Sequence, residues 1–136
     1  LTRPHSARLS KGILFVDNSG YGELGCVKDK KLNVLVRFQS WTRGLCIKDR
    51  FAFVGLSRVI PRFSCYAPGL DVEKSVCGVA AVDLRTGSEV GRIEWPYGNQ
   101  VFSVECMDEN MASGFLSPSK KDQCKIKNAF YAFKLS

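Results

Sequence analysis

Residues 6–38 read SARLSKGILFVDNSGYGELGCVKDKKLNVLVRF, a stretch that holds four short apolar segments separated by turns. These segments are rich in Val, Ile, Leu and Phe and are bounded by Gly, Asp, Asn and Lys, which is the pattern of β-strands joined by hairpins. The rhythm returns further along the chain, where ILFV at 13–16 aligns with FAFV at 51–54. A repeat of roughly 40 residues holding four strands is typical of a β-propeller blade.

The strand pattern predicts two full blades and part of a third. The first blade covers about 5–39, with strands near 6–10, 12–18, 23–28 and 32–38. The second covers about 42–96, with strands near 43–48, 50–57, 76–84 and 89–95 and an insertion at 58–75. The partial third covers about 100–136, with strands near 100–107, 111–117 and 128–135. No segment shows a sustained helical period, so we expect little helix.

We therefore expect a single all-β, β-propeller-like domain over 1–136, with about two and a half four-stranded antiparallel blades. Propellers typically need about four to eight blades, so this ring would be incomplete and the chain a fragment of a longer protein. Open blade edges would then be available to a protein partner or to self-association.

Local turn chemistry supports the strand assignment. Lys11-Gly12, Lys48-Asp49 and 85–87 (RTG) read as hairpin turns, because Gly tolerates a positive φ and Asp bonds its own backbone. The insertion at 58–75 contains two prolines and reads as a long loop, and loops of that length are often functional or lid-like.

Composition limits the function classes. The net charge of +7 suits an acidic partner, but no Lys/Arg array alternates with aromatic residues, so nucleic-acid binding is disfavoured. No apolar stretch approaches the ~18 residues of a membrane helix, so we expect no membrane association. Six cysteines occur without a CxxC pair and no export signal is present, which predicts reduced thiols and a cytoplasmic location.

Motifs for cofactors and metals are weak. The GxGxxG match at 20–25 runs into a β-branched stretch instead of a helix, so we interpret it as a glycine-rich turn and expect no cofactor. His5 is the single histidine, which argues against a metal site built on paired histidines. Asp17, Glu23 and Asp83 are candidate calcium ligands, but Asp83 is better interpreted as a turn residue and Glu23 as an arginine partner, so we expect no metal.

One cluster is suited to a ligand. The 38-residue offset places His5 on Arg43, at the start of the innermost strand of each blade, where propellers usually bind ligands. We predict a cationic rim that suits a carboxylate or phosphate group, made of Arg3, His5, Arg8, Thr42 and Arg43. The alternative is that these groups cap turns and bond neighbouring strand ends.

Five motifs carry a family resemblance: TRPHSAR (2–8), NSGYGELG (18–25), WTRGL (41–45), FAFVGLSR (51–58) and CGVAAVDLRTGSEVGRIEW (77–95). Together they resemble the uncharacterised bacterial family of predicted β-propellers called domain of unknown function 4915. The resemblance implies a soluble propeller-like fold and longer family members, but no activity. After Met107 the sequence departs from the family pattern.

Two functions remain open at this point. The first is a binding module for a small anionic ligand or a protein partner at the channel mouth. The alternative is part of a propeller enzyme, hydrolase or lactonase-like, whose remaining catalytic residues lie in blades that this chain lacks. The sequence leaves enzymatic activity undecided.

Overall fold

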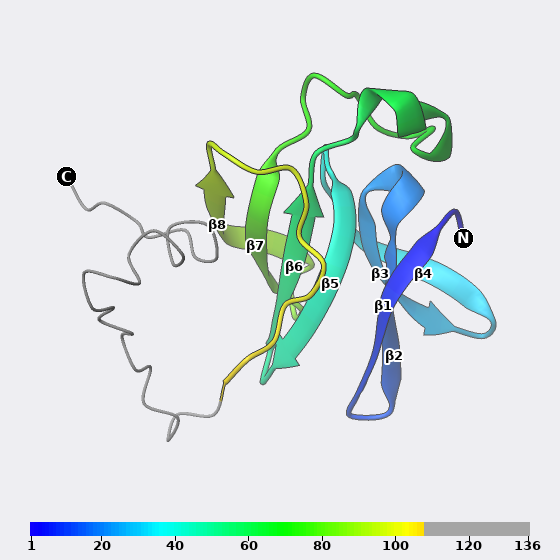
Figure 1. The fold of residues 1–136 in the computed structure, drawn as a ribbon. Coiled ribbons are helices and arrows are strands. Elements are labelled where there is room, and N and C mark those ends of the chain that lie inside the picture. The colour runs from blue at the N-terminus through cyan, green and yellow to red at the C-terminus, as the bar shows by residue number, and fades with distance from the viewer. Residues whose placement is uncertain (108–136) are drawn as a thin grey trace, which may run out of the picture. The chain divides into compact units, whose positions relative to one another are not determined.

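Eight β-strands make up most of the regular structure in the computed structural model, which describes residues 1–107 (Figure 1). They are β1 (Pro4–Ser10), β2 (Ile13–Asn18), β3 (Glu23–Lys28), β4 (Lys31–Arg37), β5 (Trp41–Lys48), β6 (Phe51–Ser57), β7 (Cys77–Asp83) and β8 (Ser88–Trp95). Two short 3-10 helices, η1 (Ser19–Tyr21) and η2 (Pro61–Tyr66), interrupt them. Each of the eight strands predicted for the first two blades is confirmed, with ends that shift by one or two residues.

The strands form two antiparallel sheets, each in simple chain order: β1-β2-β3-β4 and β5-β6-β7-β8. Neither sheet closes into a barrel. The all-β class is confirmed, and the two sheets are consistent with an incomplete propeller-like arrangement.

The predicted hairpin turns are present, and their backbone explains their residues. Lys11 and Gly12 both have positive φ (48° and 78°), and Asp49 has φ of 57° between β5 and β6. Such turns match the right-handed twist of the flanking strands. Between β7 and β8, the Asp83 carboxylate accepts the Arg85 backbone N–H at 2.9 Å, as predicted for a turn residue.

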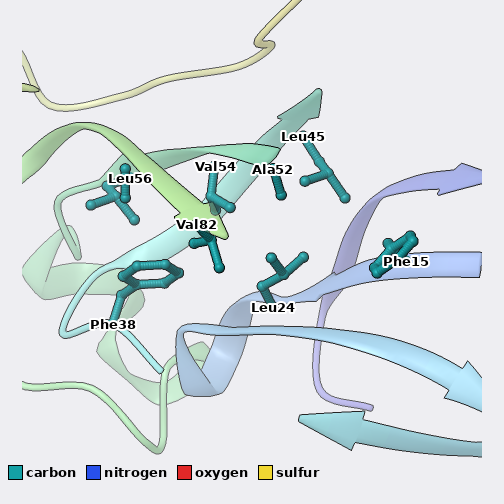
Figure 2. Packing of buried hydrophobic residues seen from close by; sticks show 9 residues of the cluster. Phe15, Leu24, Phe38, Leu45, Ala52, Val54, Leu56 and Val82 are labelled. Atoms are coloured by element: carbon teal, nitrogen blue, oxygen red, sulfur yellow. The ribbon is translucent and has the colours of Figure 1, made fainter. Parts of the chain in front are cut away.

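The hydrophobic core lies between the two sheets (Figure 2). Alternate residues of the second sheet, among them Ala52, Val54 and Leu56, are fully buried, as a period of two requires of a strand with one face inward. Leu24 of the first sheet and Leu45 of the second belong to the same cluster, which is completed by Phe15, Phe38, Ala80 and Val82. Burial of this shared face holds the sheets together.

β1 and β5, the first strands of the two sheets, lie next to each other and are both irregular. The pairing register shifts between His5 and Arg8 in β1, and between Thr42 and Leu45 in β5. At this point the backbone N–H of Gly44 donates to Ser6 Oγ at 2.7 Å, which joins one sheet to the other. Gly44 has φ of +89°, a conformation that side-chain-bearing residues rarely adopt.

The segment after β8 returns along β6 and β5 (Figure 1), and residues 101–107 form no strand. The predicted strand at 100–107 is therefore wrong. Val101 N–H donates to the hydroxyl of Ser57 at 2.9 Å, a side-chain contact that replaces a sheet ladder. The strands predicted at 111–117 and 128–135 fall outside the described residues, and the single domain over 1–136 stays a prediction. Leu1–Cys106 forms one compact unit.

The glycine-rich match is a turn, as interpreted from the sequence. It forms η1 and the first residues of β3. A Cβ on Gly20 would lie 2.7 Å from Thr2 Cγ2 and 2.9 Å from the Tyr66 carbonyl oxygen, so close packing requires glycine there. The loop thereby brings the N-terminus and the insertion together.

Replacing Leu45 by Ala is expected to lower the free energy of unfolding by about 2–5 kcal/mol, because the side chain is fully buried and leaves a cavity. Urea denaturation followed by circular dichroism measures the change. Leu9→Ala is the control, since Leu9 is 73% exposed, and the change there should stay within about 0.5 kcal/mol. Equal losses in the two variants would contradict the assigned core.

Candidate functional site

A cavity of about 310 Å³ opens where β1 and β5 meet the 58–75 insertion. Its lining combines aromatic, aliphatic and cationic side chains, among them His5, Trp41, Arg43, Arg58, Phe63 and Tyr66. The antiparallel order explains their meeting, because β1 and β5 begin at the end of the sheets where β6 finishes.

His5 is held in one orientation. Its Nδ1 lies 2.9 Å from the Arg3 carbonyl oxygen and 2.9 Å from Ser19 Oγ. Ser19 donates its single hydroxyl hydrogen to the Thr42 carbonyl at 2.5 Å, so both groups facing Nδ1 act as acceptors. Nδ1 therefore carries a hydrogen, and Nε2 is the ring nitrogen left for a ligand.

The backbone around His5 is strained. Arg3 has φ of 53° and Ser6 has φ of 52°, values in the left-handed region that few residues other than glycine adopt. Strain of this kind costs about 1–3 kcal/mol per residue and clusters at functional sites. The edge of the Trp41 ring system packs against the His5 ring, with centroids 5.7 Å apart.

Three guanidinium groups lie at or beside the cavity without a carboxylate partner within residues 1–107. Arg43 lies over the Phe102 ring, with Cζ 4.4 Å from its centroid. Arg3 lies over Tyr66 at 4.2 Å, and Arg58 donates to the Ser75 carbonyl at 3.3 Å. Each side chain is positioned by a neutral group, so its charge is not cancelled locally.

The structure brings together some of the predicted rim residues and separates others. His5 and Arg43 line the cavity, and Arg3 contacts the ring of a lining residue. Arg8 instead pairs with Glu105, with Nη2 2.5 Å from Oε1. Thr42 is fully buried, and its hydroxyl donates to the Glu23 carbonyl at 3.4 Å. Thr42 thus bonds a neighbouring strand end, the alternative that the sequence left open, whereas Arg8 pairs with a carboxylate of the segment after β8.

Sequence reasoning missed the side of the site that the insertion provides. Arg58, Phe63 and Tyr66 lie in a segment predicted only to be a functional or lid-like loop, with no residue named. The available signal was composition, since RVIPRFSCY (58–66) holds two arginines and two aromatic residues within nine positions. Trp41 contacts His5 of the other sheet and also lines the cavity.

The carboxylates of Asp17, Glu23 and Asp83 have different partners. Glu23 accepts from Arg37 Nε at 2.7 Å and from Asn18 Nδ2 at 2.6 Å, which confirms its predicted arginine partner. Asp83 binds its own turn and lies 3.7 Å from Arg50 Nε. Within the described part of the chain, no group of three or more His, Cys, Asp or Glu side chains could hold a metal ion.

Asp17 is the exception among the carboxylates. It lies opposite His5 in the β1–β2 ladder, is fully buried, and neither carboxylate oxygen has a hydrogen-bond partner among residues 1–107. Burial raises the pKa of Asp17 to about 8, against a smaller lowering effect from the Arg8 charge. At neutral pH its carboxyl is therefore mainly protonated and offsets little of the positive charge nearby.

Comparison with known proteins gives a family without an assigned activity. The sequence model of the family described as Domain of unknown function (DUF4915) matches residues 1–116. No curated protein and no solved structure matches the chain. Within residues 1–107, no helix is long and apolar enough to cross a membrane.

The buried Asp17 makes stability depend on pH. Between the ordinary Asp pKa of 3.8 and about 8, the folded chain holds a proton that the unfolded chain releases. The free energy of unfolding should therefore fall as pH rises through this window, by up to about 1.4 kcal/mol per pH unit. Asp17→Asn should remove this fall, as measured by urea denaturation from pH 5 to 9.

Asp71→Asn is the matched control, because Asp71 is an exposed carboxylate on the insertion and should leave the slope in place. A slope unchanged by Asp17→Asn would show that another group titrates.

Proposed function

This chain belongs to the family Domain of unknown function (DUF4915), and we propose that it binds a small organic anion in the cavity between β1, β5 and the insertion. One observation carries the proposal. Three guanidinium groups are gathered around a single hollow, and no carboxylate of the described residues pairs with any of them. A bound anion would supply the missing partner.

The charges are suited to an oxyanion. A guanidinium group offers parallel N–H donors that match a carboxylate or phosphate. The held His5 adds a ring nitrogen at the same cavity. Pockets for small ligands are mostly apolar with a few placed polar groups, and the aromatic and aliphatic side chains around these cations fit that description.

An enzyme is the second candidate, favoured by the geometry of His5. A histidine whose Nδ1–H is bonded to acceptors presents Nε2 as a general base. Ser19 is not its nucleophile, because Ser19 is fully buried and gives its hydrogen to Thr42. In this proposal the chain is part of a hydrolase or lactonase-like propeller, and the bound anion would be turned over instead of merely held.

The proposed setting is the cytoplasm. Five cysteines in residues 1–107 are free thiols, which fits a reducing compartment. We also propose that the edge strands β4 and β8 are available to a protein partner or to self-association.

Calorimetric titration with 2-naphthoate and with its uncharged analogue 2-naphthalenemethanol tests the binding function. The anion should bind and the alcohol should bind much more weakly. Arg43→Gln and Arg58→Gln should each weaken 2-naphthoate binding roughly 10- to 100-fold, because a charge-assisted hydrogen bond is lost.

Arg85→Gln is the matched control, since it removes the same charge from the β7–β8 turn, outside the cavity. Its affinity for 2-naphthoate should equal that of the unaltered chain. Equal affinity for the anion and the alcohol, or equal losses in all three variants, would refute the proposed site.

A further inference from the structure

The cavity lining comes from different parts of the chain. The strands supply His5, Trp41 and Arg43, while the insertion supplies Arg58 at its start and Phe63 and Tyr66 further along. We propose that the ligand is an aromatic carboxylate of one or two fused rings, its carboxylate toward the arginines and its ring face against the insertion. This inference rests on the proposed anion-binding function and names the class of anion.

The insertion places two aromatic rings in the cavity wall, and a guanidinium group lies over each, Arg62 over Phe63 and Arg3 over Tyr66. Phe63 and Tyr66 stack with centroids 6.1 Å apart and planes 29° from parallel. Both rings line the cavity and are still 43% and 42% exposed. Exposed aromatic groups at the wall of a hollow favour a partner that buries them, and flat rings prefer offset or edge contacts with other rings.

The insertion is anchored, so this wall has a defined position. Gly69 N–H donates to the Gly20 carbonyl at 3.1 Å, and a Cβ on Gly69 would lie 2.3 Å from Tyr21 Cδ1. The Arg3 guanidinium covers Tyr66 at 4.2 Å. These contacts tie a loop of the second sheet to the N-terminal part of the first. A preformed wall lowers the entropy lost when a rigid, flat ligand binds.

Size separates an organic from an inorganic anion. A cavity of about 150 Å³ accommodates benzene, so about 310 Å³ has room for one or two rings with a carboxylate. Phosphate or sulfate would satisfy the arginines but would leave Trp41, Phe63 and Tyr66 facing water. Only an anion with an apolar body uses both sides of the cavity.

The charged side selects where the carboxylate binds. Arg58 follows β6 and is fixed through its backbone N–H to the Asn99 carbonyl at 2.8 Å. Gln100 donates its side-chain N–H to the Arg58 carbonyl at 3.0 Å, a second contact that holds the Arg58 backbone. Arg43 lies on β5 and Arg58 directly after β6, whereas Phe63 and Tyr66 lie further along the insertion, so an aromatic acid has a preferred direction in the cavity.

Calorimetry on the full chain with 2-naphthoate, its saturated counterpart decahydro-2-naphthoate and inorganic phosphate tests the inference. The two organic acids share charge and skeleton but differ in aromaticity. We expect 2-naphthoate to bind about tenfold more tightly than the saturated acid, as ring–ring contacts would give. Phosphate should bind more weakly than either acid.

Two leucine variants test whether Tyr66 causes the preference for the aromatic acid. Tyr66→Leu keeps an apolar wall without a ring and should bring the two organic acids to within about twofold of each other. Tyr97→Leu is the control, because Tyr97 is 76% exposed and outside the cavity, and it should keep the tenfold preference. Circular dichroism of each variant confirms that it folds.

The outcomes separate this inference from the proposed function. If the two organic acids bind equally and Arg43→Gln weakens both, the anion site stands and the aromatic preference is wrong. If no anion binds, the proposed function itself fails. If the preference survives Tyr66→Leu, the ring face against the insertion is overturned.

Discussion

Face-to-face packing of the two sheets is the constraint on which the rest depends. Each sheet is a meander that buries one face, and fully buried side chains such as Leu24 and Leu45 come from both sheets. Because the chain order is the same in each sheet, this packing sets β1 beside β5. The hydrogen bond between Gly44 N–H and Ser6 Oγ then fixes the position of β1 along β5. His5 and Arg43 reach one cavity for that reason, although they come from different sheets.

Local chemistry was enough to predict the strands of residues 4–95, because their cause is local. Period-two apolar runs end at residues such as Lys11-Gly12 and Asp49, whose backbone turns tightly, and the structure has hairpins there. The strand predicted at 100–107 is wrong because a local apolar pattern does not show whether a segment finds a strand to pair with. An apolar run such as VFSV (101–104) satisfies a strand pattern, yet it contacts Ser57 through a side chain instead of joining a ladder.

The site was less predictable because its members meet through tertiary contacts. The repeat offset placed His5 and Arg43 at equivalent positions; they lie on β1 and β5, and both line the cavity. The same argument could not show that Glu105, distant in sequence, would pair with Arg8. Nor could it show that an insertion between β6 and β7 would cross to the first sheet and bring Tyr66 beneath Arg3. Burial of the unpartnered Asp17 also required knowledge of both sheets.

The segment that follows β8, residues 96–106, has a practical consequence for anyone shortening this protein. Asn99 accepts the Arg58 backbone N–H, and further along Cys106 N–H donates to Cys46 Sγ at 3.1 Å. A gene fragment that stops after β8, where the last strand ends, would encode every strand and still lose the groups that clamp Arg58. We expect its product to keep a native-like far-ultraviolet circular dichroism spectrum, although Arg58 would no longer be held in place at the cavity. The smallest unit worth expressing therefore extends at least to Cys106.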